Sequence, residues 1–385
     1  MPYRTFLTAF VGAVVLTPLA ILAARRLDIM DHPSEERKVH ERPTPLLGGV
    51  AIYLSFTVAV LFTLDYDEAL KGVLVGSTII FFMGLIDDMH HIRAAVKLVG
   101  QIVAALCLVK YGVVIDAIRP FWLSAVVTVL AVVGLTNALN FLDNMDGLCA
   151  GIAAVCGLGF AAIAVQSGQP WLSYLAFALV GSSLGFLIYN FKPARVFMGD
   201  AGSTFLGFTL SSLAVIGDWA EAVPVAVSVP VLVVGILIFD TTLITILRIK
   251  DGKVRTFRQW IEHADTDHTS HRLVGHGMSQ VQAVLTVYAS CGVLSALAVW
   301  IRHLSTGGAM AAVGGVAVAA AVAMVWLDRS DLRLAAGGTL LVREVVAELP
   351  PAGGRALSPE MLLARRRAGA PAERSEAAVG ADADD

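Results

Sequence analysis

The sequence is short of charged residues. Only 15% of its 385 residues are Asp, Glu, Lys or Arg, whereas a soluble globular protein typically carries about 25%. Hydrophobic residues make up 57% of the chain, and the mean hydropathy is +0.74. This composition excludes an ordinary soluble enzyme and a disordered protein. The net charge of −3 offers no basic surface, so nucleic acid is not expected as a partner.

Cysteines and the common nucleotide and zinc motifs are also scarce. The four cysteines lie in apolar runs and form no C-x-x-C pair. This excludes a disulfide framework and predicts cysteines that face the core or the lipid. There is no Walker loop, no G-x-G-x-x-G and no H-E-x-x-H, so ATP-driven transport and zinc proteolysis lose support.

Long apolar runs are what the sequence has in abundance. A membrane-spanning helix needs about 20 mostly apolar residues. We therefore predict an all-α integral membrane protein with about eleven transmembrane helices. The candidate segments are 5–24, 47–64, 69–86, 96–113, 120–139, 147–166, 171–189, 203–217, 222–246, 281–301 and 309–327. The first run ends at Arg25 and Arg26 instead of a small-residue cleavage site, which predicts a retained helix.

Two domains and one orientation follow. Residues 1–327 are predicted to form the membrane domain, and residues 328–385 a largely disordered cytoplasmic tail. Most basic residues outside the tail fall in one alternate set of loops, which the positive-inside rule places in the cytoplasm. The N-terminus is then outside and the C-terminus inside. The loops of this set are 25–46, 87–95, 140–146, 190–202 and 247–280.

The unusual polar clusters all belong to this same set of loops or to the helix ends beside them. Asp87 and Asp88 follow a wholly apolar run, and two such carboxylates can bind Mg²⁺ or accept a proton from a phosphate. The alternative is solvated charge at a helix end. Asp240 lies inside an apolar segment, where a buried acid indicates either function or a structural partner on a neighbouring helix. This one-sided distribution predicts a single polar site at the cytoplasmic membrane face.

The run 137–147 gives a stronger signal. Asn137, Asn140 and Asn144 recur at helical spacing, and Asp143 and Asp146 are i,i+3 neighbours. Burying amide and acid groups at an apolar helix end costs desolvation energy, which other contacts must offset. Their presence here therefore indicates a functional role for these side chains. The alternative is a helix-capping turn, whereas the calcium-loop pattern does not fit.

Two further clusters have chemistry suited to phosphate. The segment 199–203 is glycine-rich and precedes an apolar run, so it can bind an anion at a helix N-terminus, and Asp200 can complete a metal site. A plain N-cap turn is the alternative. His268, His271 and Arg272 indicate contact with phosphate or sugar. A zinc site and a solvated loop face are the alternatives for these three.

Taken in order, these motifs resemble the polyprenyl-phosphate N-acetylhexosamine-1-phosphate transferases, multispanning enzymes that start lipid-linked glycan assembly. The matching stretches are 31–49, Asp87-Asp88, 137–147, 199–203 and 267–272, and the resemblance covers about 5–327. The Arg37-Lys38-x-His40 pattern and the lack of three consecutive histidines in the last loop make the chain more similar to the UDP-N-acetylglucosamine branch than to the peptidoglycan branch.

The chain departs from the family motifs at two positions. Asn144 stands in the usual D-G-x-D-G where the family has its first glycine, and Ser270 replaces one histidine of H-x-H-H-R. These departures bear on the identity of the sugar more than on the reaction.

The resemblance implies transfer of an N-acetylhexosamine-1-phosphate, with N-acetylglucosamine expected, from a UDP-sugar to undecaprenyl phosphate, releasing UMP. The implied catalytic residues are Asp87, Asp88, Lys97 and Asp143. The implied substrate-binding residues are Lys38, Asn137, Asn140, Asp146, His268, His271 and Arg272. Asp200 and Asn140 are expected to hold Mg²⁺, or Mn²⁺ in its place.

The implied partners are undecaprenyl phosphate, a UDP-N-acetylhexosamine and membrane lipids, and the family also allows a homodimer. The implied location is the inner (cytoplasmic) membrane, where the enzyme would catalyse the first membrane step of a cell-envelope glycan. Three alternatives stay open: the same reaction with UDP-MurNAc-pentapeptide, a secondary transporter, and a non-catalytic scaffold.

Overall fold

The computed structural model describes residues 2–31, 43–65, 67–252, 254, 256 and 267–347, with side chains up to residue 328. The chain divides into two units, residues 1–327 and 328–385. The last helix, α14 (Thr306–Ala347), shows that part of the predicted tail is helical. The rest of the tail, which we predict to be disordered, lies outside the described residues.

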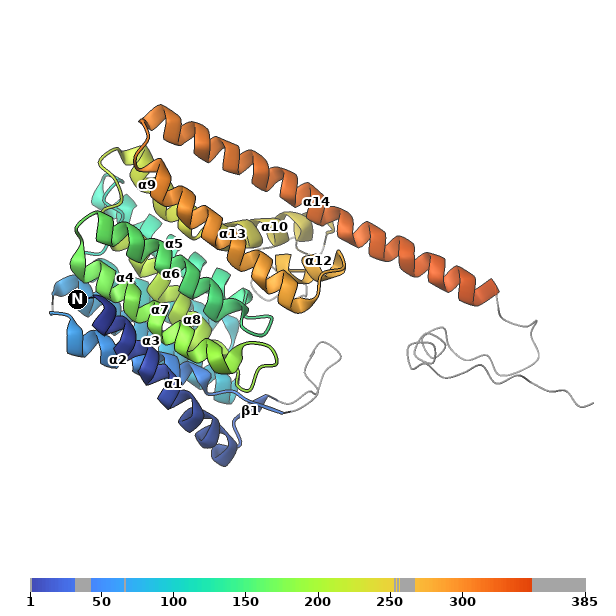
Figure 1. Ribbon diagram of the computed structural model, residues 1–385, viewed down its shortest axis with the longest axis horizontal. Helices are drawn as coiled ribbons and strands as arrows, with labels where there is room; N and C mark the ends of the chain where they lie inside the picture. The colour runs from blue at the N-terminus through green and yellow to red at the C-terminus, as the bar shows by residue number, and fades with distance from the viewer. Residues whose placement is uncertain are drawn as a thin grey trace, which may run out of the picture. The chain divides into compact units, whose positions relative to one another are not determined.

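The first unit is a helical bundle in which each predicted span coincides with one helix or a pair of helices (Figure 1). Its helices before α14 are α1 (Pro2–Leu27), α2 (Gly48–Thr63), α3 (Glu68–His90), α4 (Ala94–Lys110), α5 (Phe121–Phe141), α6 (Leu148–Gln166), α7 (Pro170–Asn190), α8 (Gly199–Ile216), α9 (Val223–Val233), α10 (Gly235–Lys250), α12 (Thr269–Gly275) and α13 (Gln280–Ile301). A short antiparallel pair, β1 (Met30–Asp31) and β2 (Thr44–Pro45), joins α1 to α2, with Met30 opposite Pro45.

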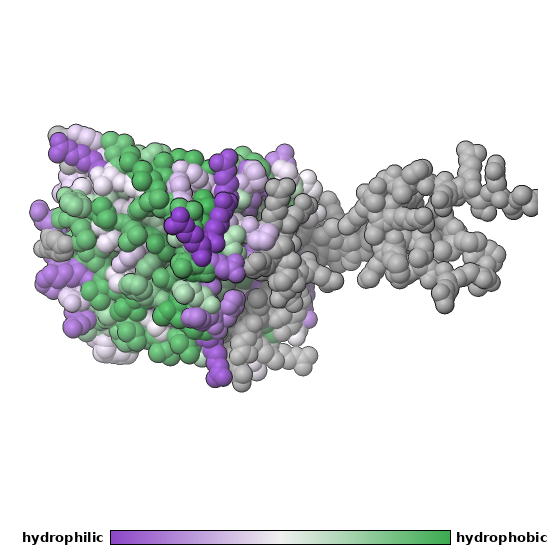
Figure 2. Space-filling view, turned by 90° about the horizontal axis from the view of Figure 1, so that it is seen from below, coloured by the Kyte–Doolittle hydropathy of each residue, from purple (hydrophilic) through white to green (hydrophobic). Residues whose placement is uncertain are grey.

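The bundle has the surface of an integral membrane protein. Among the described helices, seven are long and apolar enough to cross a membrane, or eight if α9 and α10 are one broken span. This is fewer than the eleven predicted spans, because α2, α4 and α8 do not pass that test of length and composition. Large apolar side chains such as Phe62, Leu130 and Val293 are exposed, and Figure 2 shows apolar surface over much of the bundle.

The segment 222–246, predicted as one span, is instead two helices bent by 74° at Val234. Pro230 lies within α9 and lacks the backbone N–H that a continuous helix needs. The Leu237 N–H donates to the Val234 carbonyl, and the Cys156 thiol donates to the Val233 carbonyl over 3.1 Å. The Leu237 N–H thus bonds to Val234 in place of Val233, and the buried Cys156 thiol satisfies the Val233 carbonyl that the bend leaves free.

Because successive helices reverse direction, the described residues 28–31 and 43–47 and the connections 91–93, 142–147 and 191–198 lie at one end of the bundle, here called the site end (Figure 1). Backbone hydrogen bonds join two of them: the Phe197 N–H donates to the Pro45 carbonyl, and the Gly48 N–H donates to the Phe197 carbonyl.

At the opposite end, the Arg302 guanidinium donates to the Trp219 carbonyl over 2.7 Å and to Ser167 Oγ over 2.5 Å. The Gln169 side chain exchanges two hydrogen bonds with the backbone of Asp218. These hydrogen bonds tie the short connections at this end to one another. The polar clusters predicted to carry the reaction lie at the other end, the site end.

Helix α8 is buried along nearly its whole length, and glycines let its first turn approach its neighbours. A Cβ on Gly84 of α3 would lie 2.6 Å from backbone atoms of Asp200 and Ala201. A Cβ on Gly49 of α2 would lie 2.4 Å from the Gly202 nitrogen. Real Cβ atoms do not approach so closely, so both glycines are required by the close packing of α8 against α3 and α2.

We expect Gly84→Ala to force α3 and α8 apart and to lower the unfolding temperature, because overpacking of this kind costs roughly 1–3 kcal/mol. Thermal unfolding of the purified protein in detergent, followed by circular dichroism, measures the change. Gly134→Ala on α5 is the matched control, since no atom lies within 4 Å of the added Cβ. Equal unfolding temperatures for the two variants would contradict the close-packing argument.

Candidate active site at the site end of the bundle

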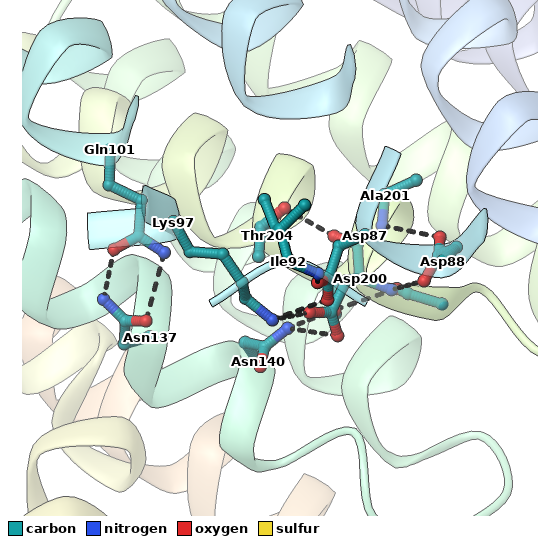
Figure 3. A network of polar contacts seen from close by, with 12 residues as sticks. Asp87, Asp88, Ile92, Lys97, Gln101, Asn137, Asn140, Asp200, Ala201 and Thr204 are labelled. Carbon is teal, nitrogen blue, oxygen red and sulfur yellow. Dashed lines mark hydrogen bonds and ion pairs between the residues drawn. The ribbon is translucent and has the colours of Figure 1, made fainter. Parts of the chain in front are cut away.

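A lysine held between two carboxylates forms the centre of the site (Figure 3). Lys97, in the first turn of α4, donates to Asp87 Oδ2 over 2.7 Å and also to Asp200 Oδ2. Asp87 lies in the last turn of α3, and its other oxygen accepts the Ile92 N–H over 2.7 Å. The beginning of α4 is thus bound to the end of α3 and to the first turn of α8.

Asp88 acts on the backbone of α8. Its Oδ1 accepts the Asp200 N–H over 2.7 Å, and its Oδ2 accepts the Ala201 N–H over 3.0 Å. These are first-turn amides, which have no acceptor within the helix itself. Gly199 has a φ of +65°, and a Cβ there would lie 2.4 Å from the Asp88 carboxylate. Glycine is therefore the residue that lets Asp88 cap α8 so closely.

Asn140 joins the last turn of α5 to α8. Its Nδ2 donates to Asp200 Oδ1 over 3.1 Å and to Ser203 Oγ over 2.8 Å. Asp143 follows in the connection after α5. Burial raises the pKa of Asp143 to about 7, and the negative charges of Asp200 and Asp146 add to the rise. A carboxyl with such a pKa can gain or lose a proton near neutral pH.

Asn137 has a partner within the bundle. Its side chain and that of Gln101 exchange two hydrogen bonds of 2.6 and 3.1 Å, and Asn137 Nδ2 also donates to the Val133 carbonyl. Gln101 is buried on α4. The structure thus gives Asn137 a role in pairing α4 with α5, and its predicted contact with substrate stays a prediction.

Asp146 holds the connection between α7 and α8. Its Oδ2 accepts the Ala194 N–H over 3.1 Å. Asp146 also lies beside Phe191, Lys192 and the first turn of α13, in a tightly packed part of the surface. The structure thus shows Asp146 holding a connection at the site end, and its predicted contact with substrate stays a prediction.

Helix α12 is anchored by Asp240. The Asp240 carboxylate, which is 1% exposed, contacts His268 Nδ1 over 2.8 Å and accepts the Thr269 N–H over 2.7 Å. Asp240 lies on α10, beyond the bend, so the bend aims α10 at the start of α12. Of the two interpretations of this buried acid, the structure shows a structural partner, and that partner is itself a predicted site residue.

The remaining predicted residues of the last loop differ in their surroundings. Asp267 receives a bidentate pair of hydrogen bonds from Arg248 of 2.7 and 2.9 Å. Arg272 is buried and donates to the Asp267 carbonyl over 2.9 Å, so it stabilises the loop. His271 is half-buried, and its pKa is lowered by burial and then by the charge of His268, which favours the neutral imidazole.

Two separate groups of predicted residues are therefore assembled. The first group is Asp87, Asp88, Lys97, Asn140 and Asp200, and the second is His268 with its neighbours on α12. Lys38 lies outside the described residues. Gln101, Arg248 and Asn190 were missed by the sequence reasoning. Asn190 accepts the Gly147 N–H and donates to the Val196 carbonyl, and its polar side chain at the end of an apolar run was the available signal.

The donor set suits a divalent cation whose coordination is completed by a substrate. Among the described residues, no group of three His, Cys, Asp or Glu side chains is arranged to hold a metal ion. Magnesium, however, is usually held by one or two carboxylates together with substrate phosphates and waters. Asp200 and Asp87 are the two carboxylates available for that pattern, and in this structure Lys97 lies between them while Asn140 donates to the other oxygen of Asp200.

Comparison with known proteins identifies the family of this chain. Residues 70–218 match the model of glycosyl transferase family 4. The chain is 34% identical over 293 residues to a probable undecaprenyl-phosphate N-acetylglucosaminyl 1-phosphate transferase of Bacillus subtilis. The aligned region covers 74% of this chain and 80% of that protein. It is 31% identical to a decaprenyl-phosphate N-acetylglucosaminephosphotransferase of Mycolicibacterium smegmatis, over 77% of this chain and 82% of that protein.

The peptidoglycan branch is also similar. A phospho-N-acetylmuramoyl-pentapeptide-transferase of Bacillus licheniformis is 30% identical, over 77% of this chain and 97% of that protein. Matches of this extent confirm the family that the ordered motifs predicted. The chain belongs to glycosyl transferase family 4, as a member of the polyprenyl-phosphate N-acetylhexosamine-1-phosphate transferases.

Proposed function

We propose that this protein transfers N-acetylglucosamine-1-phosphate from UDP-N-acetylglucosamine to undecaprenyl phosphate, giving undecaprenyl-diphospho-N-acetylglucosamine and UMP. The observation that carries the proposal is the grouping of Asp87, Lys97 and Asp200 at one end of a membrane bundle. A lipid phosphate can reach this end from the bilayer, and a nucleotide sugar can reach it from water. The Bacillus and Mycolicibacterium relatives support N-acetylglucosamine as the sugar.

The basic residues of the site end support a cytoplasmic location for the active site. Arg25 and Arg26 end α1, and Arg93, Lys192 and Arg195 lie in described connections at the same end. The positive-inside rule places such connections in the cytoplasm. The protein would then act in the cytoplasmic membrane on a donor that reaches it from the cytosol.

The reaction joins two anions, so the enzyme must mainly position them and offset their repulsion. An oxygen of the acceptor phosphate attacks the β-phosphorus of the UDP-sugar, the bond from that phosphorus to the bridging oxygen breaks, and UMP leaves. Lys97 offsets negative charge between the two phosphates, and Asp87 orients Lys97 through their 2.7 Å contact. Asp88 acts by fixing the first turn of α8, because both of its oxygens accept backbone N–H groups there.

Asp200 and Asn140 would hold Mg²⁺, and the bound cation would neutralise the diphosphate of the donor. Asp146 lies in the connection next to this group, beside the basic residue Lys192, and we place the nucleotide of the donor on that side of the site. Direct attack and a covalent aspartyl intermediate use the same residues, so this proposal is independent of that choice. A secondary transporter would have its coupling groups near the bilayer midplane, whereas these groups lie at the ends of their helices.

We expect the purified protein in detergent to convert undecaprenyl phosphate and radiolabelled UDP-N-acetylglucosamine into a lipid-extractable sugar and UMP, with loss of product on addition of EDTA. UDP-MurNAc-pentapeptide in place of UDP-N-acetylglucosamine tests the alternative branch. Product from the pentapeptide donor alone would overturn the proposed sugar. A folded sample that is silent with every UDP-N-acetylhexosamine would overturn the reaction.

Asp200→Asn is the informative variant in this assay. It keeps the shape of the side chain and removes the charge that faces Lys97 and the cation. Transfer should be lost while the unfolding temperature stays close to that of the unmodified protein. Near-normal turnover would contradict the assignment of Asp200 as the cation ligand.

The raised pKa of Asp143 predicts the pH dependence of transfer. Its pKa of about 7 means that the carboxyl is mostly protonated below pH 7 and mostly ionised above it. If the ionised form is the active one, transfer rises as pH increases through about 7. The Asp143→Asn variant should lose this inflection and keep only the titration of the acceptor phosphate, whose second pKa is about 6. Identical pH profiles for the two proteins would contradict the role of Asp143.

The contact between Asp240 and His268 also yields a prediction. Asn at position 240 keeps an oxygen at only one of the two places that the carboxylate oxygens occupy, one beside His268 Nδ1 and the other beside the Thr269 N–H. Hydrogen bonds to charged groups are worth about 1.5–3 kcal/mol. We therefore expect Asp240→Asn to lower kcat/KM for the UDP-sugar at least about tenfold. Asp218→Asn, an exposed acid at the opposite end, is the matched control and should leave kcat/KM unchanged.

A further inference from the structure

The two positions at which the chain departs from its family motifs are in contact. Asn144 lies in the connection between α5 and α6, and Ser270 lies on α12. They are 126 residues apart in sequence, yet Ser270 Oγ donates to Asn144 Oδ1 over 2.8 Å. Two departures that meet in space are expected to depend on each other, since each side chain is the environment of the other.

The geometry of this contact is well specified. Ser270 has no exposed surface, so its hydroxyl must find a partner inside the protein. Asn144 Nδ2 donates to the Phe141 carbonyl over 2.9 Å. A carbonyl can only accept, so this bond fixes the orientation of the Asn144 amide and turns its oxygen toward Ser270. Asn144 therefore bridges the last turn of α5 and α12.

The bridge joins two parts of the proposed active site. The connection after α5 carries Asp143, and α12 carries His271 directly beside Ser270. Other hydrogen bonds of α12 include those from Thr269 to Asp240 on α10, from Arg272 to the Leu327 carbonyl on α14 and from Arg272 to the Asp267 carbonyl just before α12. The contact of Ser270 with Asn144 ties α12 directly to the connection between α5 and α6, residues 142–147, here called the Asp143 connection.

We propose that Asn144 and Ser270 are a matched pair of positioning residues that sets the distance between α12 and the Asp143 connection, and so the fit of the donor sugar. This inference rests on the proposed transfer reaction. The proposal also predicts how large the side chains at positions 144 and 270 can be. Position 270 is fully buried, so a larger side chain fits there only if position 144 becomes smaller. Histidine at 270 and glycine at 144, the residues of the family motifs, satisfy that exchange.

A double-mutant cycle tests the pairing. Asn144→Ala and Ser270→Ala should each raise the KM for UDP-N-acetylglucosamine roughly 3- to 10-fold, the range expected from loss of one hydrogen bond. The KM of the double variant for UDP-N-acetylglucosamine should be no higher than that of the single variant with the higher KM. The KM for undecaprenyl phosphate should change less than about twofold. Ser211→Ala is the matched control, because Ser211 is equally buried and donates to the Phe208 carbonyl of its own helix.

An exchange of sizes tests the steric part. Ser270→His alone should lower kcat/KM for the donor more than roughly tenfold, because the imidazole has no room beside Asn144. Adding Asn144→Gly should restore kcat/KM to within about threefold of the unmodified protein. A combined variant no better than Ser270→His alone overturns the size exchange.

Two outcomes separate this inference from the proposed function. If the unmodified protein transfers a different UDP-sugar, the proposed sugar fails, and the cycle is run with the sugar that is transferred. If it transfers none, unfolding temperatures of the four alanine-cycle proteins still measure the coupling of the two side chains. Effects of the two alanine substitutions that simply multiply in KM, or add in unfolding temperature, overturn the pairing.

Discussion

The capping of α8 by Asp88 is the contact on which the site depends. Both oxygens of this carboxylate accept N–H groups of the first turn of α8, and that turn carries Asp200. Gly84 and Gly199 give the two helices the space to meet at this distance. With the turn fixed, the Asp200 carboxylate faces Lys97 and Asn140, which come from two other helices. The ends of α3, α4, α5 and α8 are thus held together at one place, and the catalytic role predicted for Asp88 stays a prediction.

This arrangement separates the groups that hold the site from those suited to chemistry. Asp88, Asp240 and the pair of Gln101 with Asn137 have their polar atoms engaged by other parts of the protein. Lys97 and Asp200 are partly exposed at the site, where a phosphate or cation can compete for them. A membrane enzyme needs both kinds, because a buried polar group without a partner is costly in an apolar bundle.

Much of this was predictable from the sequence, and the reasons differ between residues. The helices follow from long apolar runs, and the gathering of the polar loops follows from the alternation of helix direction. The bend at Val234 was missed because the run 222–246 is long and mostly apolar, so its length alone favoured one span. The partner of Asp240 could not be predicted, since a contact 28 residues away depends on how α10 and α12 pack. The same holds for Gln101, whose distance from Asn137 is set by packing between α4 and α5.

Because α8 is buried, a natural substitution along this helix can disturb Asp200 even when it lies far from the site. Asp200 is carried by a helix whose sides are closely packed, and Gly207 lies roughly 10 Å along it at 1.5 Å per residue. A Cβ on Gly207 would come within 2.8 Å of the Thr136 carbonyl on α5. A substitution there would push α8 sideways or along its axis and move Asp200 with it. An apolar substitution inside this buried helix can therefore appear in genetics as an active-site defect, although it touches no substrate.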